Sequence, residues 1–346
     1  MATDRWKRRP EGSNWGDFGA DDQLGRLNLL TAEKVLQGIA EVREGRTFCL
    51  SLPLDYPGGN RLNPQRFAPM LSPTGSADQP RYNYPRRIDN PVLTDIVCDD
   101  KVEIVLQYST QWDSFAHVGE LFDVDGDGRM QPVYYNGFRA GKDVIGIWDY
   151  EANRRLDGPT GARRLGIENM AATGVQGRAV MIDLHANFGQ ERRCVGYDEL
   201  MSVMAKDKVT VEPGDMLCLH TGYSQAVLDM KRDPDPQALQ NAFAVLDGRD
   251  PRLLQWITDS GISVIAADNY GVEQLPARPG SGTHYAAAPL HEHCLFKLGI
   301  HLGELWYLTD LARWLRERRR SRFLLTAPPL RLPGAVGSPA TPIATV

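Results

Sequence analysis

The 346-residue sequence has few cysteines, no excess of basic residues and no long apolar run. Its five cysteines are scattered without a Cys-x-x-Cys pair, which argues against a disulfide framework and against a thiolate zinc site. Lys and Arg number 39 against 44 Asp and Glu, so nucleic acid is a poor partner. No stretch approaches the roughly 18 apolar residues of a membrane span, and the polar N-terminus lacks an apolar signal region. We therefore expect a cytoplasmic protein without membrane contact.

Glycine and proline are plentiful, at 33 and 23 residues, which favours many turns over long helices. Hydrophobic residues make up 42% of the chain, enough for a substantial core. Periodicity predicts helices over 32–41 (capped by Thr31), 197–205, 251–259 and 305–322, and strands over 101–109, 179–184, 216–221 and 262–267. Alternation of helix and strand in the second half is typical of an α/β protein with ligand groups near strand ends.

Residues 53–91 are rich in Pro, Arg, Asn and Tyr and lack apolar periodicity, which predicts one long irregular loop. Loops of this length are usually functional. We expect this one to cover a pocket and to recognise an aromatic or carboxylated substrate through Arg66, Arg81, Tyr82, Tyr84, Arg86 and Arg87.

The segment from Gln107 to His117, QYSTQWDSFAH, has the pattern most indicative of a site. In an extended conformation, four polar side chains would share one face: Gln107, Ser109, Gln111 and Asp113. That is not a core pattern, although the aromatic residues among them indicate burial. We interpret the segment as part of a functional site; a half-exposed strand with its polar side in water is the simpler alternative.

This segment resembles the fingerprint H-x-G-T-H-x-D-x-x-x-H of the cyclase family, which includes bacterial kynurenine formamidase and isatin hydrolase. Thr110, Asp113 and His117 match the pattern, whereas Gln107 and Gln111 stand in place of the first two histidines and Ser109 in place of glycine. Further resemblances follow in order along the chain: Trp15-Gly16, Asp21 to Asn28, Tyr135-Asn136-Gly137, Gly177 to Asp183, Pro213-Gly214-Asp215, His220-Thr221-Gly222, Asp268-Asn269 with Glu273, and Gly299 to Glu304.

The resemblance implies an α/β fold, a single compact domain with a mixed, barrel-like central β-sheet flanked by helices. It covers most of residues 1–346, so we expect one domain carrying an N-terminal arm (1–30), the long loop (53–91) and a C-terminal tail (327–346). It also implies a homodimer or homotetramer.

Gln107 and Gln111 affect whether the site can bind a metal ion. In metal-dependent family members, the fingerprint His and Asp residues and a C-terminal His and Glu resemble a zinc or manganese site. Gln is a weak neutral ligand, so its presence at two positions predicts a site without metal or other cofactor; a divalent cation, if bound, would lie at Asp113 and Glu304. Glu304 matches the family's Glu, but Glu292 occupies the usual His position, so either neighbour, His291 or His293, could enter the site.

We therefore predict a hydrolase that cleaves a small cyclic amide, lactone or aryl amide by metal-independent acid/base catalysis. His117 would move the proton, and Asp113 and Glu304 would orient a histidine and stabilise its cation. The predicted substrate-binding residues are Gln107, Ser109, Gln111, Trp112, His291 and His293. A metal-free cyclase, dehydratase or isomerase is one alternative, and a non-catalytic small-molecule binding or assembly relative is another.

Two other features are interpreted as structural. The run D-x-D-x-D-G from Asp123 to Gly128 resembles a calcium loop, but Tyr134 occupies the position of the bidentate Glu, so we predict a hairpin turn. His301 lies in an apolar alternation and is predicted to be a surface or packing residue.

Overall fold

A mixed nine-stranded sheet forms the centre of the computed structural model, which describes residues 5–346. Its middle is four parallel strands: β13 (Gln176–Asp183), β15 (Met216–His220), β17 (Val264–Ala267) and β18 (His301–Glu304). Antiparallel strands extend it on both sides: β19 (Arg322–Thr326), β21 (Ile343–Thr345) and β1 (Thr47–Cys49) beyond β13, and β6 (Gln111–Asp113) and β20 (Gly337–Pro339) beyond β18. The sheet curls into a half-barrel, which confirms the predicted fold class.

Side chains of the buried strands alternate between two cores, one on each face of the sheet. Val180 and Ile182 of β13 belong to the core that also contains residues of α4 (Tyr197–Asp207) and α7 (Pro251–Ser260). Ala179 and Met181 belong to the other core, with α9 (Thr309–Glu317). Burial on both faces explains why these strands are continuous apolar runs.

Several helices begin or end where capping and terminating residues in the sequence predict. The Thr31 side chain accepts a hydrogen bond from the Lys34 backbone N–H and caps α1 (Ala32–Ala40), which packs across β13 and β19. Gly261 ends α7 with φ of 68°, a left-handed conformation that favours glycine. The helix predicted over 305–322 begins later than expected. The Leu305 and Trp306 amides donate to the backbone carbonyls of Asn269 and Ala267, so these two residues extend the path of β18 instead.

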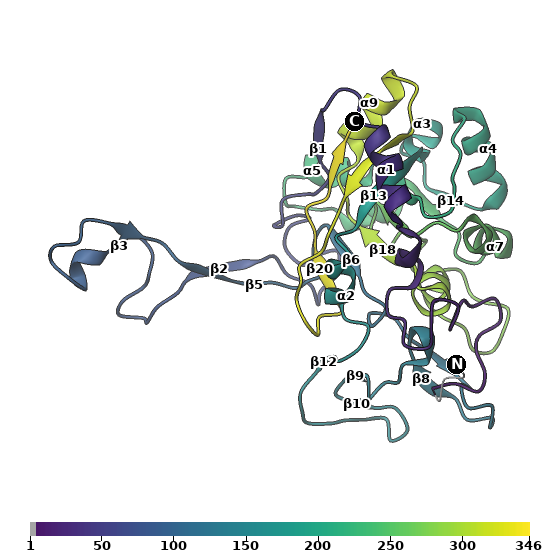
Figure 1. Cartoon of the computed structure of the whole chain (residues 1–346), viewed down its shortest axis with the longest axis horizontal. Helices are drawn as coiled ribbons and strands as arrows, with labels where there is room; N and C mark the ends of the chain where they lie inside the picture. Colours follow the sequence, from purple (N-terminus) through teal and green to yellow (C-terminus); the bar gives the residue numbers. More distant parts are fainter. Residues whose placement is uncertain (1–4) are drawn as a thin grey trace.

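The long loop predicted over 53–91 is instead a paired ribbon that we call the arm, residues 64–103. Within it β2 (Met70–Pro73) pairs with β5 (Asp100–Glu103), and β3 (Tyr84–Pro85) with β4 (Ile96–Val97). The strand predicted over 101–109 therefore ends at Glu103. Figure 1 shows the arm extending away from the sheet, so its tip does not cover the rest of the chain.

The two chain ends are integrated into the body. Trp15 of the predicted N-terminal arm is buried, and its indole N–H donates to the Phe296 carbonyl at 2.8 Å. The predicted C-terminal tail contributes β20 and β21 to the central sheet. None of the helices formed by residues 5–346 has the length and apolarity needed to cross a membrane.

The remaining elements connect the sheet strands. They are η1 (Gly25–Leu29), η2 (Arg86–Ile88), β7 (Glu120–Phe122), β8 (Gln131–Val133), η3 (Tyr135–Gly137), β9 (Val144–Ile145), β10 (Trp148–Asp149), β11 (Arg154–Arg155), β12 (Gly161–Ala162), α2 (Ile167–Ala172), α3 (Leu184–Phe188), β14 (Arg193–Val195), α5 (Tyr223–Asp229), α6 (Pro236–Gln240), β16 (Ala244–Leu246), α8 (Pro289–His291) and the π-helix η4 (Glu292–Leu298). The aspartate-rich run joins β7 to β8 as the predicted turn: Asp123 accepts the Asp127 and Gly128 amides, and Asp125 pairs with Arg139.

Candidate active site

The candidate site lies where β6 runs antiparallel to β18. Gln111 is opposite Glu304, and Trp112 is opposite Gly303. Because side chains alternate along a strand, Gln111 and Asp113 share one face and Trp112 takes the other. Trp112 packs against Trp306 there with ring centroids 4.9 Å apart, and a Cβ on Gly303 would come within 3.0 Å of Trp112. The register therefore brings Asp113 and Glu304 to the same side.

His291 reaches this side from the last residue of α8, immediately before η4. A π-helical turn holds more residues than an α-helical turn and often occurs at functional sites. That geometry accounts for the thirteen-residue separation of His291 from Glu304, one more than the family spacing implies. Of the two predicted histidines, His291 enters the site, whereas the His293 ring is 3.0 Å from the Thr258 hydroxyl outside it.

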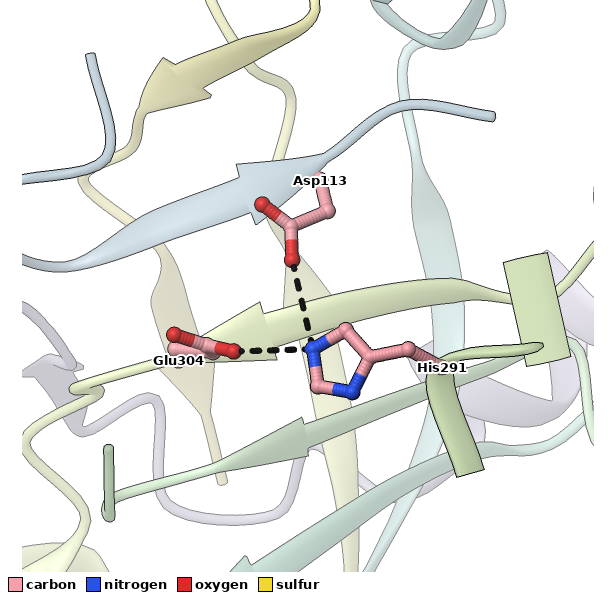
Figure 2. A group of neighbouring side chains, drawn as sticks. All are labelled: Asp113, His291 and Glu304. Carbon is pink, nitrogen blue, oxygen red and sulfur yellow. Dashed lines mark hydrogen bonds and ion pairs between the residues drawn. The ribbon is translucent and has the colours of Figure 1, made fainter. Parts of the chain in front are cut away.

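Asp113, His291 and Glu304 point toward one another (Figure 2). His291 Nε2 lies 3.2 Å from Glu304 Oε1 and 4.0 Å from Asp113 Oδ2. On the other side of the ring, His291 Nδ1 is 2.7 Å from Oε1 of the fully buried Glu273. The Gln111 side-chain amide donates to Glu304 Oε2 at 2.9 Å. All five residues are at least 95% buried, so their charges interact in a poorly solvated space.

The charges of the site are mutually dependent. Burial raises the pKa of Asp113, an effect that Glu304 reinforces and His117 and His291 oppose. Burial also disfavours the charge of Glu304, but hydrogen bonding and positive charge from His291 outweigh it and lower the pKa of Glu304. Burial lowers the pKa of His291, yet its hydrogen bonds to Glu273 and Glu304 raise that pKa to about 10. Without a bound cation, His291 is thus the positive charge between the carboxylates.

Two residues border this buried group. The side chain of His117 is 24% exposed, and its Nε2 lies 3.8 Å from Asp113 Oδ1. Arg66, at the base of the arm, donates to the Gln107 carbonyl at 2.7 Å and lies 5.4 Å from the ring centroid of Tyr270. Its positive charge opposes the rise in the pKa of Asp113 and contributes to the lowered pKa of Glu304, so it acts on both carboxylates.

The structure places the other predicted substrate-binding residues, Gln107, Ser109 and Trp112, at different distances from this group. The chain turns before β6, with the Tyr108 amide donating to the Val105 carbonyl, so the predicted extended face does not reach back to Gln107. The Gln107 amide nevertheless lies on the Asp113 side, because it packs so close to Gly337, the residue paired with Asp113, that a Cβ there would be 2.4 Å away. The Ser109 hydroxyl donates to the Pro53 carbonyl at 3.4 Å, and Trp112 is a core residue. Of the six predicted binding residues, Gln111 and His291 belong to the buried group and Gln107 lies beside Asp113, whereas Ser109, Trp112 and His293 lie outside it.

His301 is a packing residue rather than a surface residue. It is buried and stacks on Phe115 with ring centroids 4.0 Å apart, and its Nδ1 is 2.8 Å from the Asp113 carbonyl oxygen. Burial lowers its pKa to about 4, so it is neutral at physiological pH. It supports the backbone of β6 beside the site.

Sequence reasoning did not assign Glu273 a role. Glu273 accepts hydrogen bonds from the Leu290 and His291 amides as well as facing the His291 ring, so it fixes the start of α8 and the histidine together. The sequence did offer one indication. Glu273 comes shortly after Asp268-Asn269, at the carboxyl end of a parallel strand, where ligand-binding residues are common.

The residues present fit a divalent cation. Asp113, His291 and Glu304 each offer a ligand atom, and these atoms lie within 4.8 Å of one another. Both Asp113 oxygens and Gln111 Oε1 are buried without a hydrogen-bond partner among the described residues, and an absent ion is one explanation of such groups. An imidazole with carboxylates suits zinc or manganese, and a carboxylate behind the histidine is typical of metal ligands. The metal-free site predicted from the glutamines stays a prediction.

Comparisons with known proteins agree with this architecture. A crystal structure described as a novel cyclase is 29% identical and covers 96% of this chain and 97% of its own, with a TM-score of 0.71. Isatin hydrolase A from Labrenzia aggregata, bound to benzyl benzoate, is 13% identical with coverages of 86% and 93% and a TM-score of 0.51. An isatin hydrolase bound to the product analogue thioisatinate is 13% identical with coverages of 91% and 99% and a TM-score of 0.52. The two isatin hydrolases share the fold.

No curated protein matches the chain. The Cyclase family model matches residues 49–274, which include β6, His117 and Glu273. Because this match spans more than half of the sequence, the chain belongs to the cyclase family.

Proposed function

We propose that this protein is a hydrolase that opens or cleaves a small cyclic amide, lactone or aryl amide. The observation that supports this best is the partly exposed His117 at the edge of the buried Asp113, His291 and Glu304 group. Hydrolysis needs a group that takes a proton from water and later gives one to the leaving group. The fold shared with isatin hydrolases is consistent with this reaction.

His117 is the proton carrier in this proposal. Its ring is exposed enough to meet water and substrate, while its Nε2 faces the Asp113 carboxylate at 3.8 Å. The negative charge of Asp113 stabilises the imidazolium that forms when His117 takes the proton of the attacking water. The same imidazolium then protonates the leaving nitrogen or oxygen, which returns the histidine to its neutral form.

Arg66 is the substrate-orienting residue. Its guanidinium, beside the Tyr270 ring, is the positive group at the edge of the site, and a guanidinium binds a carboxylate or a developing oxyanion well. Tyr270 offers an apolar face for an aromatic substrate. Gln111 holds Glu304 through its amide N–H, so its role is to position that carboxylate.

A cation would be held by Asp113, His291 and Glu304. Bound there, it would supply Lewis-acid polarisation of the substrate carbonyl and lower the pKa of a water molecule. Metal-independent catalysis, which the sequence predicts, would rely on the His291 imidazolium for positive charge instead.

The reaction class is tested with a panel of isatin-like cyclic amides, aryl lactones and N-formyl aryl amines in water enriched in ¹⁸O. We expect turnover of at least one class, with one ¹⁸O atom in the product carboxylate, because water adds across the cleaved bond. The Arg66→Ala variant is expected to raise KM more than it lowers kcat. A product of unchanged mass, or one that has lost water, would show an isomerase or dehydratase instead.

Metal binding can be measured through thermal stability, without an activity assay. If Asp113, His291 and Glu304 hold a cation, Mn²⁺ or Zn²⁺ should raise the Tm of the wild-type protein and leave the Tm of Asp113→Asn unchanged, since a ligand at 100 times its Kd stabilises a fold by about 2.7 kcal/mol. Without added cation, Asp113→Asn should be at least as stable as wild type, because it removes a buried charge without a hydrogen-bond partner. No shift in wild type, with no stoichiometric metal on elemental analysis, would support metal-independent catalysis.

A further inference from the structure

Two buried residues next to the site carboxylates have strained backbones. Val272 immediately precedes Glu273 and has a φ of 59°. Leu305 immediately follows Glu304 and has a φ of 54°. This left-handed conformation is uncommon for residues other than glycine, and it is least favourable for a β-branched side chain such as valine. Such strain persists only where the surrounding structure holds it, and it is frequent at functional sites.

One residue, Asn269, holds both strained segments. Its backbone carbonyl accepts the Leu305 amide at 3.0 Å. Its side-chain amide donates to the Val272 carbonyl at 3.4 Å and to the Ala244 carbonyl at 3.2 Å. Asn269 is 2% exposed, so these hydrogen bonds form away from water, where they are strongest. Asn269 therefore connects the residue before one site carboxylate to the residue after the other.

Two further hydrogen bonds hold the strained segments separately. The Thr110 hydroxyl donates to the Leu305 carbonyl. The Leu246 amide donates to the Val272 carbonyl at 3.1 Å. Each of these two residues holds one segment, whereas Asn269 holds both. The position of one segment relative to the other therefore depends on Asn269.

The two carboxylates that these segments carry contact the same histidine ring. Glu273 Oε1 lies 2.7 Å from His291 Nδ1, and Glu304 Oε1 lies 3.2 Å from His291 Nε2. A rotation of the backbone at Val272 or Leu305 would move the attached carboxylate, because each strained residue is its direct neighbour in the chain. The orientation of the ring therefore depends on the two segments keeping their relative position.

Asn269 also has one polar atom without a partner. Its Oδ1 is buried and accepts no hydrogen bond from residues 5–346. An unpartnered buried oxygen costs free energy. Departures of this kind from the local rules of stability are expected at functional sites.

We propose that Asn269 is a positioning residue that fixes Glu273 and Glu304 relative to each other and thereby orients His291. This inference rests on the proposed function, in which His291 and the carboxylates around it form the buried part of the site. Asn269 acts through the backbone of residues 272 and 305 rather than by touching the substrate.

The first test needs no substrate and measures amide hydrogen exchange in the full chain. Asn269→Asp keeps the size of the side chain but replaces the N–H donors by an oxygen that faces two carbonyls. We expect the Leu305 and Leu246 amides to exchange at least about tenfold faster in this variant, relative to the amides of β13, which report opening of the whole sheet. Unchanged relative exchange would overturn the proposal.

Asn136→Asp is the matched control. Asn136 is fully buried, and its side-chain amide likewise donates to three backbone carbonyls, all within residues 19–22. The same change there should leave the relative exchange of the two amides as in wild type. Circular dichroism checks that the variants fold. If Asn269→Asp does not, Asn269→Ala takes its place, because it removes the donors without adding a charge.

The second test is steady-state kinetics on the substrate of the panel that turns over. We expect kcat of Asn269→Asp to fall about 10–100-fold with KM within about threefold of wild type, because the carboxylates move and Arg66 stays in place. Asn136→Asp should keep the wild-type kcat at temperatures where both variants are folded. Faster exchange with a wild-type kcat, or equal losses of kcat in both variants, would overturn the positioning role. A wild type without turnover would instead remove the proposed function, and the exchange result would still decide whether Asn269 holds the two segments.

Discussion

His117→Ala is expected to lower kcat by about 10²–10⁴-fold, the usual range for loss of a general acid/base residue. Asp113 lies 3.8 Å from His117 but does not replace it, because its carboxylate is fully buried and faces His291. KM should change little, since the ring moves a proton rather than anchoring the substrate. The measurement is steady-state kinetics on whichever substrate of the panel turns over, with added imidazole expected to restore part of the rate.

The control for this prediction is His293→Ala. His293 resembles His117 in being a half-buried histidine, and the sequence also suggested it for the site, but its ring faces Thr258. We expect its kcat to remain within about threefold of wild type, because it contacts none of the site carboxylates among the described residues. Equal losses in both variants would mean that the assay reports folding, and an unchanged rate in His117→Ala would remove His117 from the mechanism.

Glu273→Gln is expected to lower the free energy of unfolding by about 3 kcal/mol, the scale for breaking a buried charge pair. Glu273 accepts the amides of Leu290 and His291 and faces His291 Nδ1 at 2.7 Å, so the substitution removes the charge that fixes this ring. Because Glu273 is a positioning residue, kcat should fall about 10–100-fold with KM unchanged, even at temperatures where the variant is fully folded. Urea unfolding and kinetics at low temperature measure the two effects.

Glu292→Gln provides the matched control for that change. The same Glu→Gln change is made at the residue that follows His291 in the chain. Glu292, however, is partly exposed and pairs with Lys297 at 3.3 Å. A surface ion pair contributes about 0–1 kcal/mol, so both stability and kcat should stay close to wild type. A similar loss of kcat in both variants would show that η4 tolerates no change and would leave Glu273 without a specific role.

Local physical chemistry explains which parts of the fold were predictable from the sequence. The Thr31 cap and the Gly261 terminator act through neighbouring backbone groups, so the helices they bound were predicted within one or two residues. The central strands were predicted because burial on both faces makes them continuous apolar runs. The arm was not, since its strands are exposed on both faces and therefore show neither an apolar run nor an alternation.

The site was partly predictable for a related reason. Asp113, His117 and Glu304 were placed by the family pattern, and Gln111 follows from strand alternation with Asp113. The extended conformation expected from Gln107 onward was wrong because the turn at Val105 to Tyr108 has no strong local signal. The choice between His291 and His293 depends on a π-helix, whose wider turn changes the spacing without a recognisable composition. Arg66 and Tyr270 meet only through tertiary structure.

The pairing of β6 with β18 determines when the site forms during folding. The hydrogen bond between Gln111 and Glu304 joins residues 193 positions apart, and this pair completes the site. Closing so long a loop costs conformational entropy that local contacts cannot offset, so non-local strand pairs form late. Partly folded forms can therefore hold most of the parallel strands and remain chemically inert. We expect the group of Asp113, His291 and Glu304 to form only once β6 has paired with β18, and to separate when this sheet edge opens.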